Sequence, residues 1–217
     1  DQLAVLTGSA ARGIGSGQLA ALTTAQVAAL ATGAVSTLTT QALAGLSTAD
    51  IQALTGGQVA AILPNQLAVL TTAQVAAVET ADLAQLSTMA IRGMTSTQTR
   101  VLSADQLAAL SADHVANLTS AAISGLSVAQ LSGLTATQLA ALGASGAPGL
   151  SSAHLAALTT AQIAALAPGA LSGLATAALA GRQTVATWPS GSDSRARAAW
   201  YSRFRRSTRS CVLITAF

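Results

Sequence analysis

Two histidines are the strongest candidates for metal chemistry in this 217-residue chain, which has a single cysteine, Cys211. His114 and His154 both occupy one position of an eight-residue repeat at which glutamine is usual, and they lie five repeats apart. Two imidazoles that share a zinc ion must each lie about 2 Å from it. Histidines separated by five repeats are not expected to come so close together. We interpret both histidines as substitutes for glutamine and predict no metal site.

The other reactive side chains form no catalytic motif. Serine is abundant, but the Gly-x-Ser-x-Gly nucleophile elbow is missing from the sequence. The acidic residues are scattered and form no repeated pair for acid–base catalysis. The segment 13–17, Gly-Ile-Gly-Ser-Gly, lacks the spacing, the preceding strand and the lysine of a phosphate-binding loop. We therefore predict that the chain is not an enzyme and uses no cofactor.

The eight-residue repeat, or octad, must position all of these side chains. From Leu22 to Leu174 an aliphatic residue recurs at every eighth position, and it is Leu in 17 of 20 octads. With this residue as position one, position six holds a second aliphatic series that is interrupted only at Thr99 and Ala147. The consensus is Leu-Thr-Thr-Ala-Gln-(Leu/Val/Ile)-Ala-Ala. Because the chain begins at Asp1, inside a repeat, we expect it to be a fragment of a longer array.

Each octad is predicted to form one short helix. A continuous helix would turn about 800° per octad, and the excess of about 80° would soon move the aliphatic residues around its surface. Residues three apart share a face of a helix but lie on opposite faces of a strand. Position two is Ser or Thr in 14 of 20 octads, and Gln is the commonest residue three positions later, which is the spacing of a capping box. The pattern indicates a capped helix of about six residues followed by a sharp bend.

Helices this short are not stable alone, so the octads are predicted to stack into a tight α-solenoid with the Thr-Thr-x-Gln corners facing water. Position eight is Ala or Gly in 15 of 20 octads, which would let neighbouring helices approach closely. We expect two octads per turn, with three as the alternative, because Ile62, Val78 and Met94 replace Leu in every second octad of that region. Segments 8–17 and 143–149 contain helix breakers and no caps, and loose or kinked structure is expected there.

Two regions of different composition divide the chain. Residues 1–181 contain three arginines and six acidic residues, a net charge of −3, whereas residues 182–217 contain seven arginines and one aspartate, a net charge of +6. The second region holds every aromatic residue and no octad. We predict an all-α solenoid over 1–181 and an irregular, poorly ordered tail over 182–217. The solenoid is too acidic to favour nucleic acid and too often interrupted by polar residues to span a membrane. The basic tail could touch anionic surfaces.

Two nearly pure copies of the repeat show a resemblance to known proteins. The runs from Leu22 to Leu30 and from Leu158 to Leu166, Leu-Thr-Thr-Ala-Gln-(Val/Ile)-Ala-Ala-Leu, resemble tandem octads of very large bacterial secreted or surface proteins, which are described as adhesin-like. The resemblance extends over residues 1–181. It implies an extracellular or bacterial cell-surface location and a stalk or scaffold role, and it transfers no catalytic or binding residue.

The predicted function is a non-enzymatic structural array, a spacer or scaffold in a larger bacterial surface or secreted protein. The alternative is a binding module that uses the Thr/Ser-rich face for a glycan, ice or a protein, and the uncharged surface after Asp113 also favours self-association. Repeat arrays usually bind through positions that vary between copies. Larger polar residues at positions seven and eight, Arg92, Arg100 and Asn117, form the candidate interaction surface. Sequence drift at exposed positions is the simpler explanation of the same residues.

Overall fold

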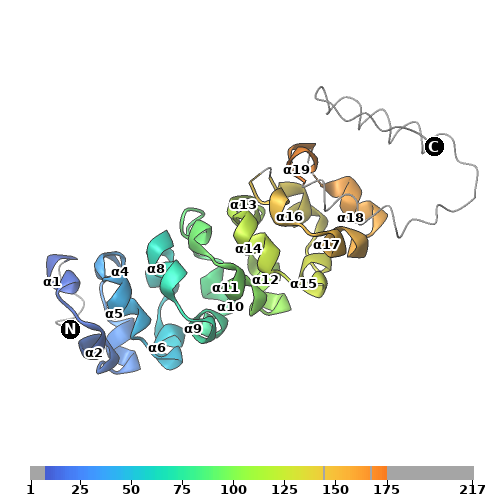
Figure 1. The fold of residues 1–217 in the computed structure, drawn as a ribbon. Coiled ribbons are helices and arrows are strands. Elements are labelled where there is room, and N and C mark those ends of the chain that lie inside the picture. Colours follow the sequence, from blue (N-terminus) through green and yellow to red (C-terminus); the bar gives the residue numbers. More distant parts are fainter. Residues whose placement is uncertain (1–7, 144, 167, 175–217) are drawn as a thin grey trace, which may run out of the picture.

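The computed structural model describes residues 8–143, 145–166 and 168–174, and these residues form helices without any strand. Nineteen short α-helices and two 3₁₀-helices follow one another within this part of the chain, one per octad, in an elongated array (Figure 1). The predicted all-α repeat fold is confirmed. The tail over 182–217 lies outside the described residues.

The helices form three stacks, because each helix lies on the third helix after it, with close contact in every pair except α12 and α15. The first stack contains α1 (Gly8–Arg12), α4 (Thr32–Thr37), α7 (Gly56–Ala60), α10 (Thr80–Leu83), α12 (Ala104–Ala109), α15 (Val128–Ser132) and α17 (Ser152–Ala157). The second contains α2 (Ser16–Ala20), α5 (Thr40–Ala44), α8 (Pro64–Val69), η1 (Ala90–Gly93), α13 (Ala112–Asn117), α16 (Ala136–Ala141) and α18 (Thr160–Ala165). The third contains α3 (Thr24–Ala28), α6 (Thr48–Ala53), α9 (Thr72–Ala77), α11 (Ser96–Arg100), α14 (Ser120–Gly125), η2 (Ala147–Gly149) and α19 (Pro168–Gly173).

One turn of the solenoid therefore contains three octads. The expectation of two octads per turn is wrong, and the alternative of three is correct. Ile62, Val78 and Met94 replace Leu in alternate octads, but this changes only which aliphatic side chain enters the core. It does not report which helices stack, because every octad presents the same aliphatic positions to the interior.

Both aliphatic series fill the core of the array. From Leu30 to Leu166 the side chains at position one are at most 6% exposed, and from Leu19 to Leu155 those at position six are at most 3% exposed. Burying one such side chain contributes about 1.5–3 kcal/mol relative to leaving it exposed. Stacking thus supplies the stability that helices of three to six residues lack on their own.

Capping boxes begin most of the helices, as the spacing of Ser or Thr and Gln predicts. At the start of α9, Thr71 Oγ1 accepts from the backbone N–H of Gln74 (3.2 Å), and the backbone N–H of Thr71 donates to Gln74 Oε1 (2.7 Å). The helix ends at Val78, whose extended backbone (φ −61°, ψ 127°) turns the chain into the next octad. Each octad therefore contains its own start and stop.

The expectation of loose structure at 8–17 is wrong. Helices α1 and α2 cover most of that segment, and Ala11 is fully buried. Gly15 has no side chain to cap α2, but its backbone N–H donates to Gln18 Oε1 (2.9 Å). In the segment 143–149, the described residues form the three-residue η2, and Ala147 is fully buried. Small residues there shorten the helix without removing it from the stack.

Candidate functional site

The bends between successive helices are held by side chains from the next turn of the solenoid. Each of these side chains stands at position five of its octad. Gln58 Oε1 accepts from the backbone N–H of Thr55 (2.8 Å), while Gln58 Nε2 donates to the carbonyls of Val27 (2.9 Å) and Leu30 (2.8 Å). Val27 lies in the last turn of α3 and Leu30 in the bend that follows it. The Val27 carbonyl also accepts from the backbone N–H of Leu30 (3.1 Å), whereas the Leu30 carbonyl belongs to the stretch after a helix end where intrahelical donors run out. We call this arrangement, one side chain joining two turns, the corner clamp.

The corner clamp recurs along the array. The glutamines that form it are Gln58, Gln66, Gln74, Gln98, Gln106, Gln130, Gln138 and Gln162. In each case the shortest distance from Nε2 to a carbonyl oxygen is between 2.6 and 2.9 Å. Six of these side chains are at most 5% exposed, so the expectation that the glutamines face water is wrong for those six. Gln26, at the start of α3, is exposed as expected.

His114 and His154 form the same clamp with an imidazole. His114 Nδ1 accepts from the backbone N–H of Ser111 (3.2 Å), and its Nε2 lies 2.7 Å from the carbonyl oxygen of Leu86. Both bonds are made by the neutral ring with its proton on Nε2. His154 makes the equivalent bonds at 3.2 and 2.9 Å. The interpretation of these residues as substitutes for glutamine is confirmed, and the described residues contain no cluster of His, Cys, Asp and Glu suited to a metal.

Two aspartates at position five lack the donor that a clamp needs. Asp50 Oδ2 accepts from the backbone N–H of Ser47 (2.9 Å), so the cap is kept. Asp82 is half-buried near Gly56, in the first stack. Burial raises the pKa of Asp82, and the negative charge of Glu79 raises it further. An ionised carboxylate can cap a helix, but it cannot donate to the carbonyls of the preceding turn.

Apart from the two aspartate octads, most octads without a clamp follow a second pattern, with Ala or Gly at position five and Gly at position eight. The pairs are Ala42 and Gly45, Ala90 and Gly93, Ala122 and Gly125, Gly146 and Gly149, and Ala170 and Gly173. A Cβ atom on Gly93 would collide with the carbonyl of Pro64, and one on Gly149 with the carbonyl of Ser120. The predicted close approach at position eight is confirmed at these glycines. One octad, 30–37, has Ala34 at position five without a glycine at position eight.

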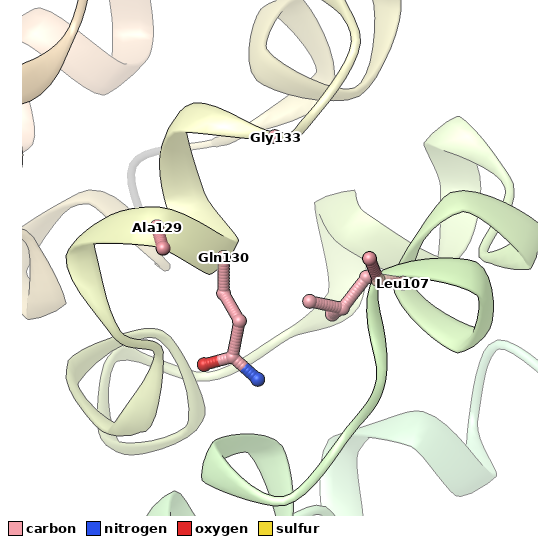
Figure 2. A pocket seen from close by; sticks show the side chains of 5 residues that line it. Leu107, Ala129, Gln130 and Gly133 are labelled. Atoms are coloured by element: carbon pink, nitrogen blue, oxygen red, sulfur yellow. The ribbon is translucent and has the colours of Figure 1, made fainter.

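One described octad combines the two patterns. Octad 126–133 has Gln130 at position five, as in clamped octads, and Gly133 at position eight, as in octads without a clamp. Of the stacked neighbours in the described array, α12 and α15 approach least closely. A pocket of about 40 Å³ lies between them, lined by Ala104, Leu107, Ala129, Gln130 and Gly133 (Figure 2). Gln130 keeps its clamp across this gap, and Gly133 has no side chain to fill the space.

The candidate interaction residues lie on two of the three stacks. Arg92 in η1 is exposed, and Asn117 in α13, on the next turn of the second stack, is half-buried. Asn117 Nδ2 donates to the backbone carbonyl of Asp113 (2.9 Å). Arg100 in α11 is exposed on the third stack. Three stacks thus divide residues that are close in sequence, and a role in binding stays a prediction.

Sequence reasoning assigned the glutamines one task and missed the second. The signal was Gln66, which follows Leu63 at position two, where no hydroxyl can take part in a capping box. The backbone N–H of Leu63 still donates to Gln66 Oε1 (2.9 Å), and Gln66 Nε2 donates to the carbonyls of Val35 and Leu38 (both 2.9 Å). A glutamine kept where half of the cap is missing indicates that it serves another partner.

The stacks and corner clamps define the class of protein, a helical repeat array. Residues 75–112 match a family model described as the ALTTAQ repeat, and the matched segment extends from α9 to the start of α13. No match was found among curated proteins or among solved structures. None of the helices in the described ranges is long and apolar enough to cross a membrane.

Proposed function

We propose that this array is a non-enzymatic spacer or scaffold in a larger bacterial surface or secreted protein, located outside the cell. One observation supports the proposal: the polar side chains at positions two and five of the repeat serve the array itself. The hydroxyls at position two cap helices, and the amides at position five clamp corners. The pocket between α12 and α15 is small and mainly apolar, which gives little support to catalysis.

The corner clamps favour the stiffness that a spacer needs. Each clamp joins one turn to the preceding turn, so pulling the turns apart breaks hydrogen bonds and exposes core side chains together. Neighbouring helices lie about 8–10 Å apart when their side chains interlock. The length of the array is therefore set by the number of its three-octad turns.

Deleting one complete turn tests this proposal. Removal of residues 102–125 joins Val101 to Leu126 and keeps both aliphatic series in register. We expect small-angle X-ray scattering to show a folded array that is shorter by about 8–10 Å. As a control, removal of residues 102–105 displaces both series and should unfold the adjoining turns. A flexible-chain scattering profile for the unmodified protein, or collapse after removal of the whole turn, would refute a rigid spacer.

A binding module on a hydroxyl-rich face is the second candidate, and the third stack favours it. Positions two and three are both Ser or Thr on five successive turns of that stack, at Thr23–Thr24, Ser47–Thr48, Thr71–Thr72, Thr95–Ser96 and Thr119–Ser120. At position three, Thr24, Thr48 and Thr72 are exposed. They would present hydroxyl and methyl groups once per turn to a neutral glycan, to ice or to a protein.

Three substitutions on that stack test the second candidate. Combined Thr24→Ala, Thr48→Ala and Thr72→Ala should weaken binding to immobilised neutral polysaccharide or reduce inhibition of ice growth. The matched control, Thr40→Ala, Thr88→Ala and Thr160→Ala, removes the same groups from the second stack. An unmodified chain that does neither, or equal losses in both triple variants, would count against this face.

A further inference from the structure

Exposed aliphatic side chains form two groups on the described surface. Leu63, Val69 and Met89 are 42%, 40% and 60% exposed, and they lie in or beside α8 and η1, which pack on each other. We call these three residues the α8–η1 knob. Val101 and Val128 are 38% and 40% exposed and lie in the bend before α12 and at the start of α15.

The second group lies at the α12–α15 pocket. Gln130, which lines the pocket, donates through Nε2 to the carbonyls of Arg100 (3.2 Å) and Leu102 (2.7 Å), the two residues next to Val101. Val128 lies two positions before Gln130 on the same helix. Across the gap, the Leu107 side chain on α12 faces α15 (Figure 2). Val128 is thus next in sequence to Ala129, which lines this pocket, and Val101 lies between the two residues whose carbonyls Gln130 clamps.

We propose that the α12–α15 pocket binds the Met89 side chain of a second copy of this chain. A volume of about 40 Å³ admits the end of one narrow apolar side chain, and methionine is unbranched and fits irregular gaps. Met89 is also anomalous in its own octad. At position four all the other octads from Leu22 onwards have Ala, Gly or a polar residue, so an exposed methionine there is not required by the fold.

The charges near the two surfaces do not oppose this contact. Arg92 is next to the knob on η1. Arg100 ends α11 and Asp105 lies in the first turn of α12, on either side of the bend before the pocket. Their charges are opposite. The pocket side therefore has no net charge to repel the approaching arginine.

The knob and the pocket belong to different elements of one chain, so each copy can donate a knob and accept another. A contact of this kind is heterologous and extends from copy to copy unless the geometry closes a ring. The arrays would associate side by side through their middle turns. This inference does not rest on the spacer role, which concerns the length of one chain and not its association.

Sedimentation velocity from micromolar to millimolar concentration tests the inference. A reductant prevents Cys211 from linking two chains. We expect the average mass of the full chain to rise with concentration. Met89→Gln removes the methionine of the knob and Gly133→Leu fills the pocket, and each should weaken association about tenfold or more. The matched control is Thr97→Gln, at position four of the next octad, and it should associate like the unmodified chain.

A mixing experiment separates this contact from general stickiness. The Met89→Gln chain keeps its pocket, and the Gly133→Leu chain keeps its knob. An equimolar mixture should form a one-to-one complex that grows no further, although each variant alone associates weakly. Ala129→Leu fills the pocket from another position and replaces Gly133→Leu if that variant loses its helical circular dichroism signal.

Three results would overturn the inference. The first is that the unmodified chain stays monomeric throughout the concentration range. The second is that the knob and pocket variants associate as strongly as the control, and the third is that the mixture of variants stays monomeric. Association that disappears only when residues 175–217 are removed would assign it to that segment and would equally overturn the contact.

Discussion

Gly125 stands at position eight of its octad, and replacing it with alanine should destabilise the array. A Cβ atom there would collide with the carbonyl oxygen of Ser96 and with Thr99 Oγ1, both in α11. Overpacking of this kind typically costs about 1–3 kcal/mol. Moving α14 away also lengthens the 2.7 Å hydrogen bond from Thr99 Oγ1 to the carbonyl of Ala122, a loss of about 1 kcal/mol. We expect Gly125→Ala to lower the free energy of unfolding by about 2–4 kcal/mol.

The same substitution at Gly133 should have the opposite sign. A Cβ atom there would lie 3.4 Å from the carbonyl oxygen of Ala129 and 3.5 Å from that of Gln130, which are ordinary contact distances. The backbone of Gly133 (φ −79°, ψ −11°) is one that alanine adopts readily. Alanine loses less backbone entropy on folding, so Gly133→Ala should raise the free energy of unfolding by about 0.5–1 kcal/mol.

Urea unfolding followed by far-UV circular dichroism measures both variants. Because the exchange is identical, its effect on the unfolded chain is similar in both, and the difference between them reports native packing. Equal slopes with midpoints displaced in opposite directions would support the two octad patterns. If Gly125→Ala is as stable as the unmodified chain, α11 and α14 are not in close contact. If Gly133→Ala is destabilised, the space beside α15 is not open.

Three further substitutions test the core and the clamps. Leu110 is 2% exposed, so Leu110→Ala should lower the free energy of unfolding by about 2–5 kcal/mol in the same assay, and a loss below about 0.5 kcal/mol would place position one outside the core. The pKa of Asp82 is higher in the folded protein than its ordinary value of 3.8, so the ionised carboxylate opposes folding. The free energy of unfolding should therefore fall as pH rises from 3.8 through the raised pKa. Asp82→Gln supplies a clamp amide and should add about 1 kcal/mol at neutral pH; an unchanged dependence of stability on pH would contradict this explanation. His114→Gln preserves both hydrogen bonds and should change stability by less than about 0.5 kcal/mol, whereas His114→Leu leaves the Leu86 carbonyl without a donor and should cost about 1–3 kcal/mol. Equal stabilities of these two variants would show that the clamp contributes nothing.

The local elements of this protein were predictable because their causes lie within one octad. The hydroxyl and the amide of a capping box are three positions apart, and the two aliphatic positions share one helical face. Thr71, Gln74 and Val75 therefore specify α9 without reference to any distant residue. The assignment of His114 to the position of glutamine followed from the same local register.

The number of octads per turn was decided by the tertiary structure. Any stack of octads buries positions one and six, so the octad is compatible with two or three helices per turn. Closing the turn depends on the bend angle at residues such as Leu54 and Val78, which the residue type does not specify. The structure closes after three octads, and that period determines which exposed side chains lie on one stack.

The second task of the glutamines was also decided only by the fold. Gln58 Nε2 donates to backbone carbonyls 28 and 31 residues earlier in the chain. Every residue has a backbone carbonyl, so no partner side chain in the sequence marks the bond. The α12–α15 pocket arises for the same reason, because the glutamine at 130 and the glycine at 133 are each common in the repeat. Only stacking on α12, three octads earlier, turns their combination into an unfilled space.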